Sequence, residues 1–561
     1  MGDIKVYCEN TQAYESVVIG TTLQELCKKV GCGHVLAALV DNKLKSLDYK
    51  VINPHNVRFV CYDHPDGRRT YIRSLCFVLQ KVVRDMYPGK VLIIDYSLPS
   101  GLYCEIRELC PLEDGRPNVY FVKDDEIEAI EDAMRKIIAA DLPFTKEMRS
   151  LDECCEIYGS QHQSEKVNLI RTIGRFNYNV YTLGGCQDTF HGPLIPSTGL
   201  LTTFALTAFN DGFCLQYPME GDTDKVLPMK RQSKLATALK DHSDWCSIMG
   251  VRGVGTLNNV VLSGKIIDLI NLSEALHERK YAEIANQIYA RRGSVKIVFI
   301  AGPSSSGKTS TSKRLALQCR ILGLNPRVIE LDNYFVEREL TPRDENGEYD
   351  FEALGAMDLD LLGCQLNDLL EGKSVEIPRF DFKDGRKYFE GNYMQLHEKD
   401  ILIMEGIHAL NPAMIPGVDP SKVFRVYASA LTSLSIDENN NISTSDNRML
   451  RRMIRDNRTR GVVPEETIMR WQSVRRGENR NIFPFQENAD ALFNSAHIFE
   501  LPVLKYYAEP LLRRISPNSP AYTEASRLLK FLDYIVALSP AEIAAIPPTS
   551  ILREFIAGQT L

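Results

Sequence analysis

Residues 296–322, KIVFIAGPSSSGKTSTSKRLALQCRIL, decide the fold of the second half of this 561-residue chain. An apolar run of strand length leads into a turn that fits the pattern G-x-x-x-x-G-K-[ST], and a helical stretch follows the turn. Glycines let backbone N–H groups wrap phosphate groups, and the helix N-terminus adds positive potential. The stretch therefore predicts a phosphate-binding loop between a buried strand and a helix.

The residues of this loop are expected to bind ATP and Mg²⁺. Lys308 would reach the β- and γ-phosphates, and the Thr309 hydroxyl would bind Mg²⁺. The full set of expected ATP-binding residues is Gly302, Ser304, Ser305, Ser306, Gly307, Lys308, Thr309 and Ser310.

Further apolar runs, RVIEL, DILIM and FRVYA, alternate with helical stretches after this loop. The alternation predicts an α/β domain whose parallel sheet has helices on both faces. The second strand leads into IELDNYF, which contains Asp332, and the third ends in DILIMEGIH, which contains Glu405. Ligands bind at the carboxyl edge of such sheets. We therefore expect Asp332 to accept a proton from an attacking hydroxyl and Glu405 to hold Mg²⁺.

Composition and charge narrow the class of protein. The chain is 44% hydrophobic and 25% charged, with a net charge of -7. It shows no apolar run of membrane-spanning length and no signal-peptide pattern, and its 14 cysteines form no C-x-x-C pair. We expect a cytoplasmic protein with reduced thiols and no membrane contact. The acidic balance argues against nucleic-acid binding by the whole chain.

The length predicts several domains. Short apolar runs with one helical stretch fill residues 1–65, and a second block with two long helical stretches fills residues 67–220. We call residues 1–220 the N-terminal module. A helical connector is expected over residues 221–290, a P-loop domain over residues 291–501 and a helical C-terminal segment over residues 502–561.

Six motifs of the P-loop domain resemble the uridine kinase and phosphoribulokinase family in order and spacing. They are GPSSSGKT, LDNYF, YDFEALGAMDLDLL, VEIPRFDFKDGRK, ILIMEGIHAL and RRMIRDNRTRG. The resemblance implies that Asp332 is the catalytic base and that Glu405 is a magnesium ligand. It also implies that Arg452, Arg455 and Arg460 are lid arginines, which would neutralise charge on the transferred phosphoryl group together with Lys308.

The acceptor side departs from uridine kinases at several positions. Glu352 stands where those enzymes have an Asp that grips ribose hydroxyls, Phe380 replaces a Tyr, and Arg470 replaces a Gln. Val462 also replaces a lid Arg. We expect Glu352, Phe380, Arg452 and Arg470 to bind the acceptor. Arginines at 470, 475, 476 and 480 would also suit a sugar phosphate, so the acceptor stays open.

The N-terminal module resembles threonyl-tRNA synthetase. Residues 1–65 are similar to its TGS domain, a β-grasp fold, and residues 67–217 to its second domain, an α+β editing domain. The supporting stretches are YIRSLCFVLQKVVRDMYPG, IIAADLPFTKE and YTLGGCQDTFHGPLIPSTG. The four positions of that domain's HxxxH and CxxxH pairs hold Arg73, Phe77, Phe190 and Leu194. Such residues offer no editing chemistry, so we expect a scaffold or binding module.

These features together predict an ATP-dependent small-molecule kinase, similar to a group of long-chain predicted nucleoside kinases. The preferred acceptor is a uridine-like nucleoside, phosphorylated on a ribose hydroxyl. One alternative is a kinase of a sugar phosphate. Another is a nucleotide-switched regulator that binds RNA or a ligand, for which the basic stretch GRRTYIRS is a candidate surface. Oligomerisation through the N-terminal module stays open.

Overall fold

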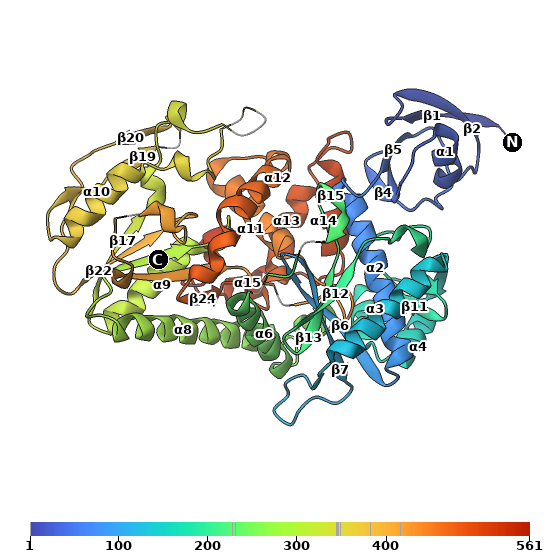
Figure 1. Cartoon of the computed structure of the whole chain (residues 1–561), viewed down its shortest axis with the longest axis horizontal. Coiled ribbons are helices and arrows are strands. Elements are labelled where there is room, and N and C mark those ends of the chain that lie inside the picture. Colours follow the sequence, from blue (N-terminus) through green and yellow to red (C-terminus); the bar gives the residue numbers. More distant parts are fainter. Residues whose placement is uncertain are drawn as a thin grey trace.

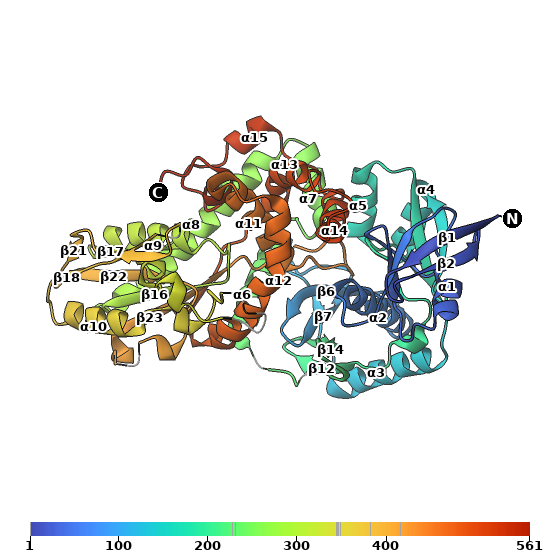
Figure 2. The same ribbon diagram turned by 90° about the horizontal axis from the view of Figure 1, so that it is seen from above.

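The computed structural model describes residues 2–226, 228–230, 232–343, 347, 349–381, 383–415, 417–432 and 434–561. Figure 1 shows the P-loop domain, in green and yellow, at one end of an elongated molecule and the N-terminal module, in blue and cyan, at the other. Red helices of the C-terminal half lie between the two, and a view from above gives the same order (Figure 2). No helix in the described ranges is both long and apolar enough to cross a membrane.

Residues 3–60 form a five-stranded sheet in the order β2-β1-β5-β3-β4 with one helix on it. The elements are β1 (Asp3–Cys8), β2 (Ala13–Val18), α1 (Leu23–Val30), β3 (Ala37–Val40), β4 (Lys43–Lys45) and β5 (Asn56–Val60). Thr22 and Glu25 cap the start of α1 reciprocally, and Gly31, at φ 69°, ends it in the left-handed conformation. This is the β-grasp fold expected from the sequence.

The second part of the N-terminal module is α+β, as predicted. Helix α2 (Pro65–Met86) is buried along most of its length. One sheet has the order β12-β13-β7-β6, with β8 paired to β7, and a second has the order β11-β10-β9. The strands are β6 (Lys90–Leu98), β7 (Gly101–Glu108), β8 (Val119–Tyr120), β9 (Thr145–Ser150), β10 (Asn177–Leu183), β11 (Cys186–Asp188), β12 (Ala205–Phe209) and β13 (Gly212–Gln216). The other helices are α3 (Asp124–Ala139), α4 (Leu151–Ser160) and α5 (Ser164–Ile173).

The stretch expected to be a helical connector begins with a strand. β15 (Asp222–Val226) pairs with β14 (Pro218–Met219) in an antiparallel hairpin. Helices α6 (Ser233–Ile248), α7 (Val254–Leu262) and α8 (Ile266–Ala290) follow. The run DTDKV is mostly polar and has no clear alternation of apolar residues. The sequence therefore did not predict a strand here.

The P-loop domain contains the predicted parallel sheet, in the order β17-β22-β16-β23-β24. Its strands are β16 (Ile297–Ala301), β17 (Asn325–Glu330), β22 (Asp400–Glu405), β23 (Val423–Ser429) and β24 (Ala491–Asn494). Val298 and Ile300 pack on one face with α8 and α9 (Lys308–Ile321), whereas Ile297 and Phe299 pack on the other with α10 (Leu359–Leu370). Successive side chains point to opposite faces, so a fully apolar strand serves both cores.

Two helices and two small hairpins extend from this sheet. The helices are α11 (Thr444–Arg460) and α12 (Pro464–Asn481). The hairpins pair β18 (Val375–Glu376) with β21 (Tyr393–Met394), and β19 (Arg379–Asp381) with β20 (Arg386–Tyr388).

The C-terminal segment is helical, as expected, and is part of the main core. It contains α13 (Glu500–Leu512), α14 (Tyr522–Leu532), α15 (Pro540–Ala544) and α16 (Arg553–Ile556). Apolar side chains of α13 and α14 share one cluster with those of α7 and α11. The chain then returns to the P-loop domain, where Lys313 Nζ of α9 donates to the Leu561 carbonyl at 3.0 Å. Figure 1 shows the C-terminus beside α9.

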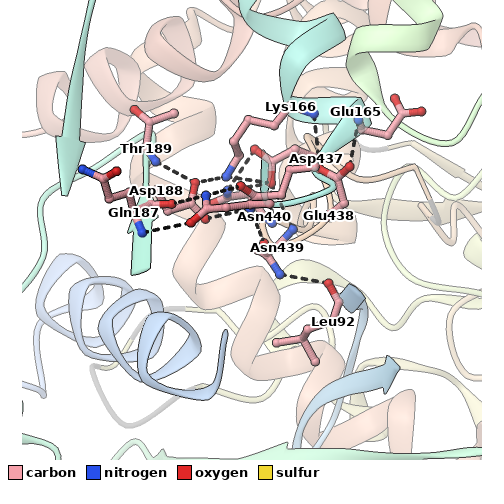
Figure 3. Close-up of polar contacts among 12 residues, drawn as sticks. Leu92, Glu165, Lys166, Gln187, Asp188, Thr189, Asp437, Glu438, Asn439 and Asn440 are labelled. Atoms are coloured by element: carbon pink, nitrogen blue, oxygen red, sulfur yellow. Dashed lines mark hydrogen bonds and ion pairs between the residues drawn. The ribbon is translucent and has the colours of Figure 1, made fainter. Parts of the chain in front are cut away.

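A buried polar network joins the N-terminal module to the loop that precedes α11 (Figure 3). Lys166 of α5 pairs with Asp188 of β11, and its Nζ lies 3.5 Å from Asp437 Oδ1. Glu438 accepts hydrogen bonds from the backbone N–H groups of Glu165 at 2.8 Å and Lys166 at 3.2 Å. A carboxylate at a helix start stabilises that helix. The P-loop domain and the N-terminal module are therefore packed against each other through charged groups.

Candidate active site

The phosphate-binding loop has the backbone that its glycines predict. Gly307, at φ 82°, comes directly before α9 and adopts the left-handed conformation. At Gly302 a Cβ would lie 1.9 Å from the Ala428 carbonyl oxygen of β23, so the close approach of that strand requires glycine. Ser305 also has a positive φ, 59°, which is costly for a residue with a side chain. Local strain of this kind clusters at functional sites.

Glu405 lies at the end of β22, beside the loop. It is 7% exposed, and its Oε1 accepts a hydrogen bond from the Thr309 hydroxyl at 2.5 Å. Burial raises the pKa of Glu405 to about 7; the nearby Lys308 cation acts in the opposite direction, and the Asp332 carboxylate adds to the rise. A bound cation would stabilise the ionised form of this buried carboxylate.

Thr309 and Glu405 are the residues that would hold Mg²⁺. One hydroxyl and one carboxylate suit Mg²⁺, which keeps several waters and binds phosphate oxygens in such sites. In the described parts of the chain, no group of three or more His, Cys, Asp or Glu side chains is arranged to hold a metal ion. This donor set therefore fits an ion that is bound together with the phosphates.

Asp332 occupies the 3₁₀ turn Leu331–Tyr334, which directly follows β17. Burial raises the pKa of Asp332, whereas the cations Lys308, Arg460 and Arg455 counteract the rise. The folded chain thus brings the loop lysine and two predicted lid arginines close to the carboxylate of the predicted base.

The three predicted lid arginines share a partner that the sequence reasoning missed. Asp456 of α11 is 3% exposed. Its carboxylate lies 3.2 Å from Arg452 Nε, 2.9 Å from Arg455 Nη2 and 3.4 Å from Arg460 Nη1. Arg452 Nη1 also donates to the Ser304 hydroxyl of the loop at 2.9 Å. The i,i+4 spacing of Arg452 and Asp456 on a helix was the signal that could have revealed this partner.

Two buried ion pairs that involve arginines of α11 also contact the loop. Arg448 pairs with Glu478 through both carboxylate oxygens, and Arg451 pairs with Glu500 in the same way. Glu478 Oε1 accepts from the Ser304 N–H at 3.0 Å, and Arg448 Nη1 donates to the Ser304 carbonyl at 3.1 Å. The first pair therefore positions the loop backbone. The sequence offered no signal for it, because Arg448 and Glu478 are on different helices.

Glu352 and Phe380, which we expect to bind the acceptor, contact Gly477 and Asn333 respectively. Glu352 packs against Gly477 of α12, where an added Cβ would lie 2.5 Å from the Glu352 Cβ. Burial raises the pKa of Glu352 to about 7, and the nearby Arg452 cation counteracts the rise. The Phe380 N–H donates to Asn333 Oδ1 at 3.2 Å, which places Phe380 beside the turn of Asp332. Both residues are therefore close to predicted catalytic groups.

Arg470 is exposed on α12, and its role in acceptor binding stays a prediction. Arg476 and Arg480 are exposed as well, whereas Arg475 is half-buried and its Nη1 lies 3.1 Å from Glu478 Oε2. Helix geometry points neighbouring residues in different directions, so a run of arginines is divided between faces. Arg475 thus contacts Glu478, which binds the loop backbone.

Residues 297–500 match the Phosphoribulokinase / Uridine kinase family. All of the predicted catalytic, metal and substrate residues lie within this match. A solved structure described as a possible uridine kinase from Bacillus stearothermophilus is 19% identical, with a TM-score of 0.25, and the alignment covers 36% of this chain and 89% of that one.

The N-terminal region is similar to threonine--tRNA ligases. The ligase of Thermotoga neapolitana is 28% identical over 197 residues, which are 35% of this chain and 29% of the ligase. The ligase of Acidithiobacillus ferrooxidans is 28% identical over 213 residues, which are 37% of this chain and 31% of the ligase. The chain thus spans about a third of the length of these relatives.

In the ligase-like module, four positions are expected to have lost editing chemistry. The side chains at these positions lie close together in the folded chain. Phe77 is fully buried, and its ring centroid lies 5.2 Å from that of Phe190; Leu194 belongs to the same cluster. Arg73 is buried beside them and donates from Nη1 to the Pro193 carbonyl at 2.7 Å. Burial lowers the pKa of Arg73 to about 10. These side chains fill the site with contacts to one another.

Two arginines of the basic stretch of this module pair with carboxylates. Arg68 Nη2 lies 3.2 Å from Glu220, and Arg69 Nη2 lies 2.8 Å from Asp66 and 3.0 Å from Glu524 of the C-terminal segment. Paired arginines attract phosphate backbones less than free ones. The stretch contributes contacts between segments of the chain.

Proposed function

We propose that this protein is an ATP-dependent small-molecule kinase that transfers the γ-phosphoryl group to a hydroxyl of a uridine-like nucleoside. The observation that carries the proposal is the position of Asp332, a half-buried carboxylate whose pKa is raised by desolvation, with Lys308, Arg455 and Arg460 near it. A base, a loop lysine and lid arginines at one point are the parts that phosphoryl transfer needs. The family match of residues 297–500 supports the same class of reaction.

In the proposed mechanism Asp332 accepts the proton of the acceptor hydroxyl as that oxygen attacks the γ-phosphorus. Its raised pKa brings it closer to the range in which a carboxylate is an effective base. Lys308 and the lid arginines neutralise the negative charge that spreads over the transferred group. Mg²⁺ bound by Thr309 and Glu405 would add charge neutralisation at the phosphates.

On the acceptor side, Glu352 would accept hydrogen bonds from ribose hydroxyls, and Phe380 would contact the acceptor through its ring. The Arg452 cation beside Glu352 is also compatible with the phosphate of a sugar phosphate. This second acceptor class therefore remains an alternative within the same reaction. Arg470 is left out of the proposed acceptor site because its side chain is exposed.

We also propose that the N-terminal module is a scaffold and not a hydrolase. Its former editing positions hold side chains that pack together, and its buried network reaches the loop before α11. A purely regulatory nucleotide switch would not require Asp332 and Glu352 beside the phosphate site. A regulatory switch therefore accounts for fewer of these residues than a kinase does.

A screen of ATP turnover with the full-length chain tests the proposal. ADP release would be measured with Mg²⁺ and each acceptor in turn, with nucleosides in one arm and sugar phosphates in the other. We expect turnover that depends on a nucleoside, with uridine-like bases among the best. If only phosphorylated sugars stimulate ADP release, a sugar phosphate would replace the nucleoside as the proposed acceptor. ATP consumption that no acceptor stimulates would refute a small-molecule kinase.

A further inference from the structure

The C-terminal segment places a carboxylate on the phosphate-binding loop. Glu554 of α16 accepts from the Ser310 N–H at 3.3 Å and from the Ser310 hydroxyl at 2.5 Å, in both cases through Oε2. Gln559 Nε2 donates to the same hydroxyl at 2.7 Å. Ser310 follows the motif residue Thr309 directly, yet Glu554 is 244 residues further along the chain.

The Ser310 N–H is one of the groups that such a loop directs at phosphate. Within α9, the Thr311 N–H already bonds back to the Gly307 carbonyl at 2.9 Å, so the amides of Lys308, Thr309 and Ser310 precede the helical hydrogen bonds. Loops of this motif cradle the α- and β-phosphates with backbone amides, while the lysine reaches the β- and γ-phosphates. The Ser310 amide, furthest along the helix, then faces the α-phosphate. The Glu554 carboxylate occupies that position.

The backbone around Glu554 is firmly held. Leu552 and Phe555 are fully buried, and Arg458 of α11 donates to the carbonyls of Glu554 at 2.8 Å and Phe555 at 3.2 Å. Ile551 packs against Gly307, where an added Cβ would lie 2.4 Å from the Ile551 side chain. Because burial and hydrogen bonds fix this backbone, the side chain of Glu554 is the part that can turn away.

We propose that Glu554 is a specificity-determining residue on the donor side, which holds the α-phosphate position until a nucleotide displaces its side chain. A nucleoside di- or triphosphate brings an anionic α-phosphate to the same N–H and hydroxyl groups and must replace the carboxylate there. Inorganic pyrophosphate can bind at the β- and γ-positions without doing so. Glu554 thus lowers the affinity for nucleotides and leaves that for pyrophosphate unaffected. The inference rests on the proposed function insofar as the loop binds donor phosphates.

Isothermal titration of the full-length chain with MgADP and, separately, with magnesium pyrophosphate tests this inference. In Glu554→Ala we expect the affinity for MgADP to rise about tenfold, equivalent to about 1.4 kcal/mol. The affinity for pyrophosphate should change less than about twofold, within the usual effect of a remote substitution. Glu554→Gln keeps the size and one acceptor oxygen but removes the charge, so it should show a smaller gain for MgADP. Thermal melting of each variant confirms that it is folded.

Glu542→Ala is the matched control. Glu542 lies in the same segment and also caps a helix, with its Oε2 accepting from the Ser539 N–H and hydroxyl, both at 2.7 Å. Its removal should leave the affinities for both ligands unchanged, since its carboxylate caps α15 and not the phosphate-binding loop.

Three results would overturn the inference. MgADP affinity in Glu554→Ala could stay the same or fall, or the affinities for both ligands could rise equally. If the wild-type chain binds MgADP and Glu554→Ala binds it no better, only the role of Glu554 is refuted. If neither the wild-type chain nor the variants bind MgADP or pyrophosphate, the proposed function is refuted as well.

Discussion

The molecule contains two regions that are similar to enzymes. The side chains at the corresponding site of each region are arranged in opposite ways. In the N-terminal module, Phe77 and Phe190 pack ring against ring, and Arg73 donates to a backbone carbonyl. In the P-loop domain, Glu405 is a buried carboxylate whose pKa is raised to about 7, and burial also raises the pKa of Asp332. The first site is filled by packed side chains, whereas the second contains carboxylates beside a phosphate-binding loop.

This difference separates structural from functional burial. Apolar groups that fill one another's space lower the free energy of the folded state directly. Buried carboxylates whose pKa is raised by burial make this free energy less favourable. Such groups also occur in the network of Asp188 and Glu438, so Glu405 is a candidate for function because it also contacts the phosphate-binding loop. Substitutions should therefore reduce stability in the N-terminal module and activity in the P-loop domain.

The largest effect is expected at Asp332. Asp332→Asn removes the proposed base and should lower kcat by about 10²- to 10⁴-fold, the usual contribution of general base catalysis. MgADP affinity, measured by titration calorimetry, should change little. Asp360→Asn, at an exposed position on α10, serves as the control for charge and should keep normal turnover. Wild-type kcat in Asp332→Asn would exclude it as the base.

Phe77 should show the reverse pattern. Phe77→Ala empties space in a fully buried cluster and should lower the free energy of unfolding by about 3–5 kcal/mol. Chemical denaturation measures the loss, and kcat at a temperature where the variant is folded should stay near wild type. Phe176→Ala, at a ring that is 87% exposed, is the matched control and should leave stability unchanged. A large fall in kcat of folded Phe77→Ala would contradict the scaffold role.

A smaller effect is expected from the ionisation of Glu352. Since burial raises the pKa of Glu352 to about 7, the carboxylate is mostly protonated at pH 6 and mostly ionised at pH 8. If the ionised form binds acceptor hydroxyls, KM for the acceptor should be about tenfold higher at pH 6 than at pH 8. Steady-state kinetics across this range should show that the dependence disappears in Glu352→Gln. An unchanged pH profile in that variant would remove Glu352 from acceptor binding.

The smallest effect is expected at Arg470. Its side chain is exposed on α12, so Arg470→Ala should change KM for the acceptor by less than about twofold. Arg452→Ala is the comparison, because Arg452 contacts the loop through the Ser304 hydroxyl. Measuring KM for the acceptor in both variants under the same conditions tests which arginine contributes more to acceptor binding. A larger effect at Arg470 than at Arg452 would return Arg470 to the acceptor site.

Much of the P-loop domain could be predicted because its signals are local. The four apolar runs form β16, β17, β22 and β23. Glu405 ends β22, and Asp332 lies in the turn that follows β17. β24, only four residues long, and the small paired strands were missed because strands of two to four residues are too short to show a period. The exposure of Arg470 could not be predicted, because a run of arginines does not indicate which helix face each one occupies.

The sequence by itself determined the phosphate-binding loop and the strand-end carboxylates. It also determined that Arg73, Phe77, Phe190 and Leu194 stand at the positions that the resemblance to threonyl-tRNA synthetase assigns to editing. Each depends on residue type, spacing or the fixed geometry of one strand or helix. Only the tertiary structure decided that Glu478 holds the loop backbone and that Glu554 reaches Ser310. These contacts join segments that are distant in the chain, and they form because burial of the α11–α16 core brings those segments together.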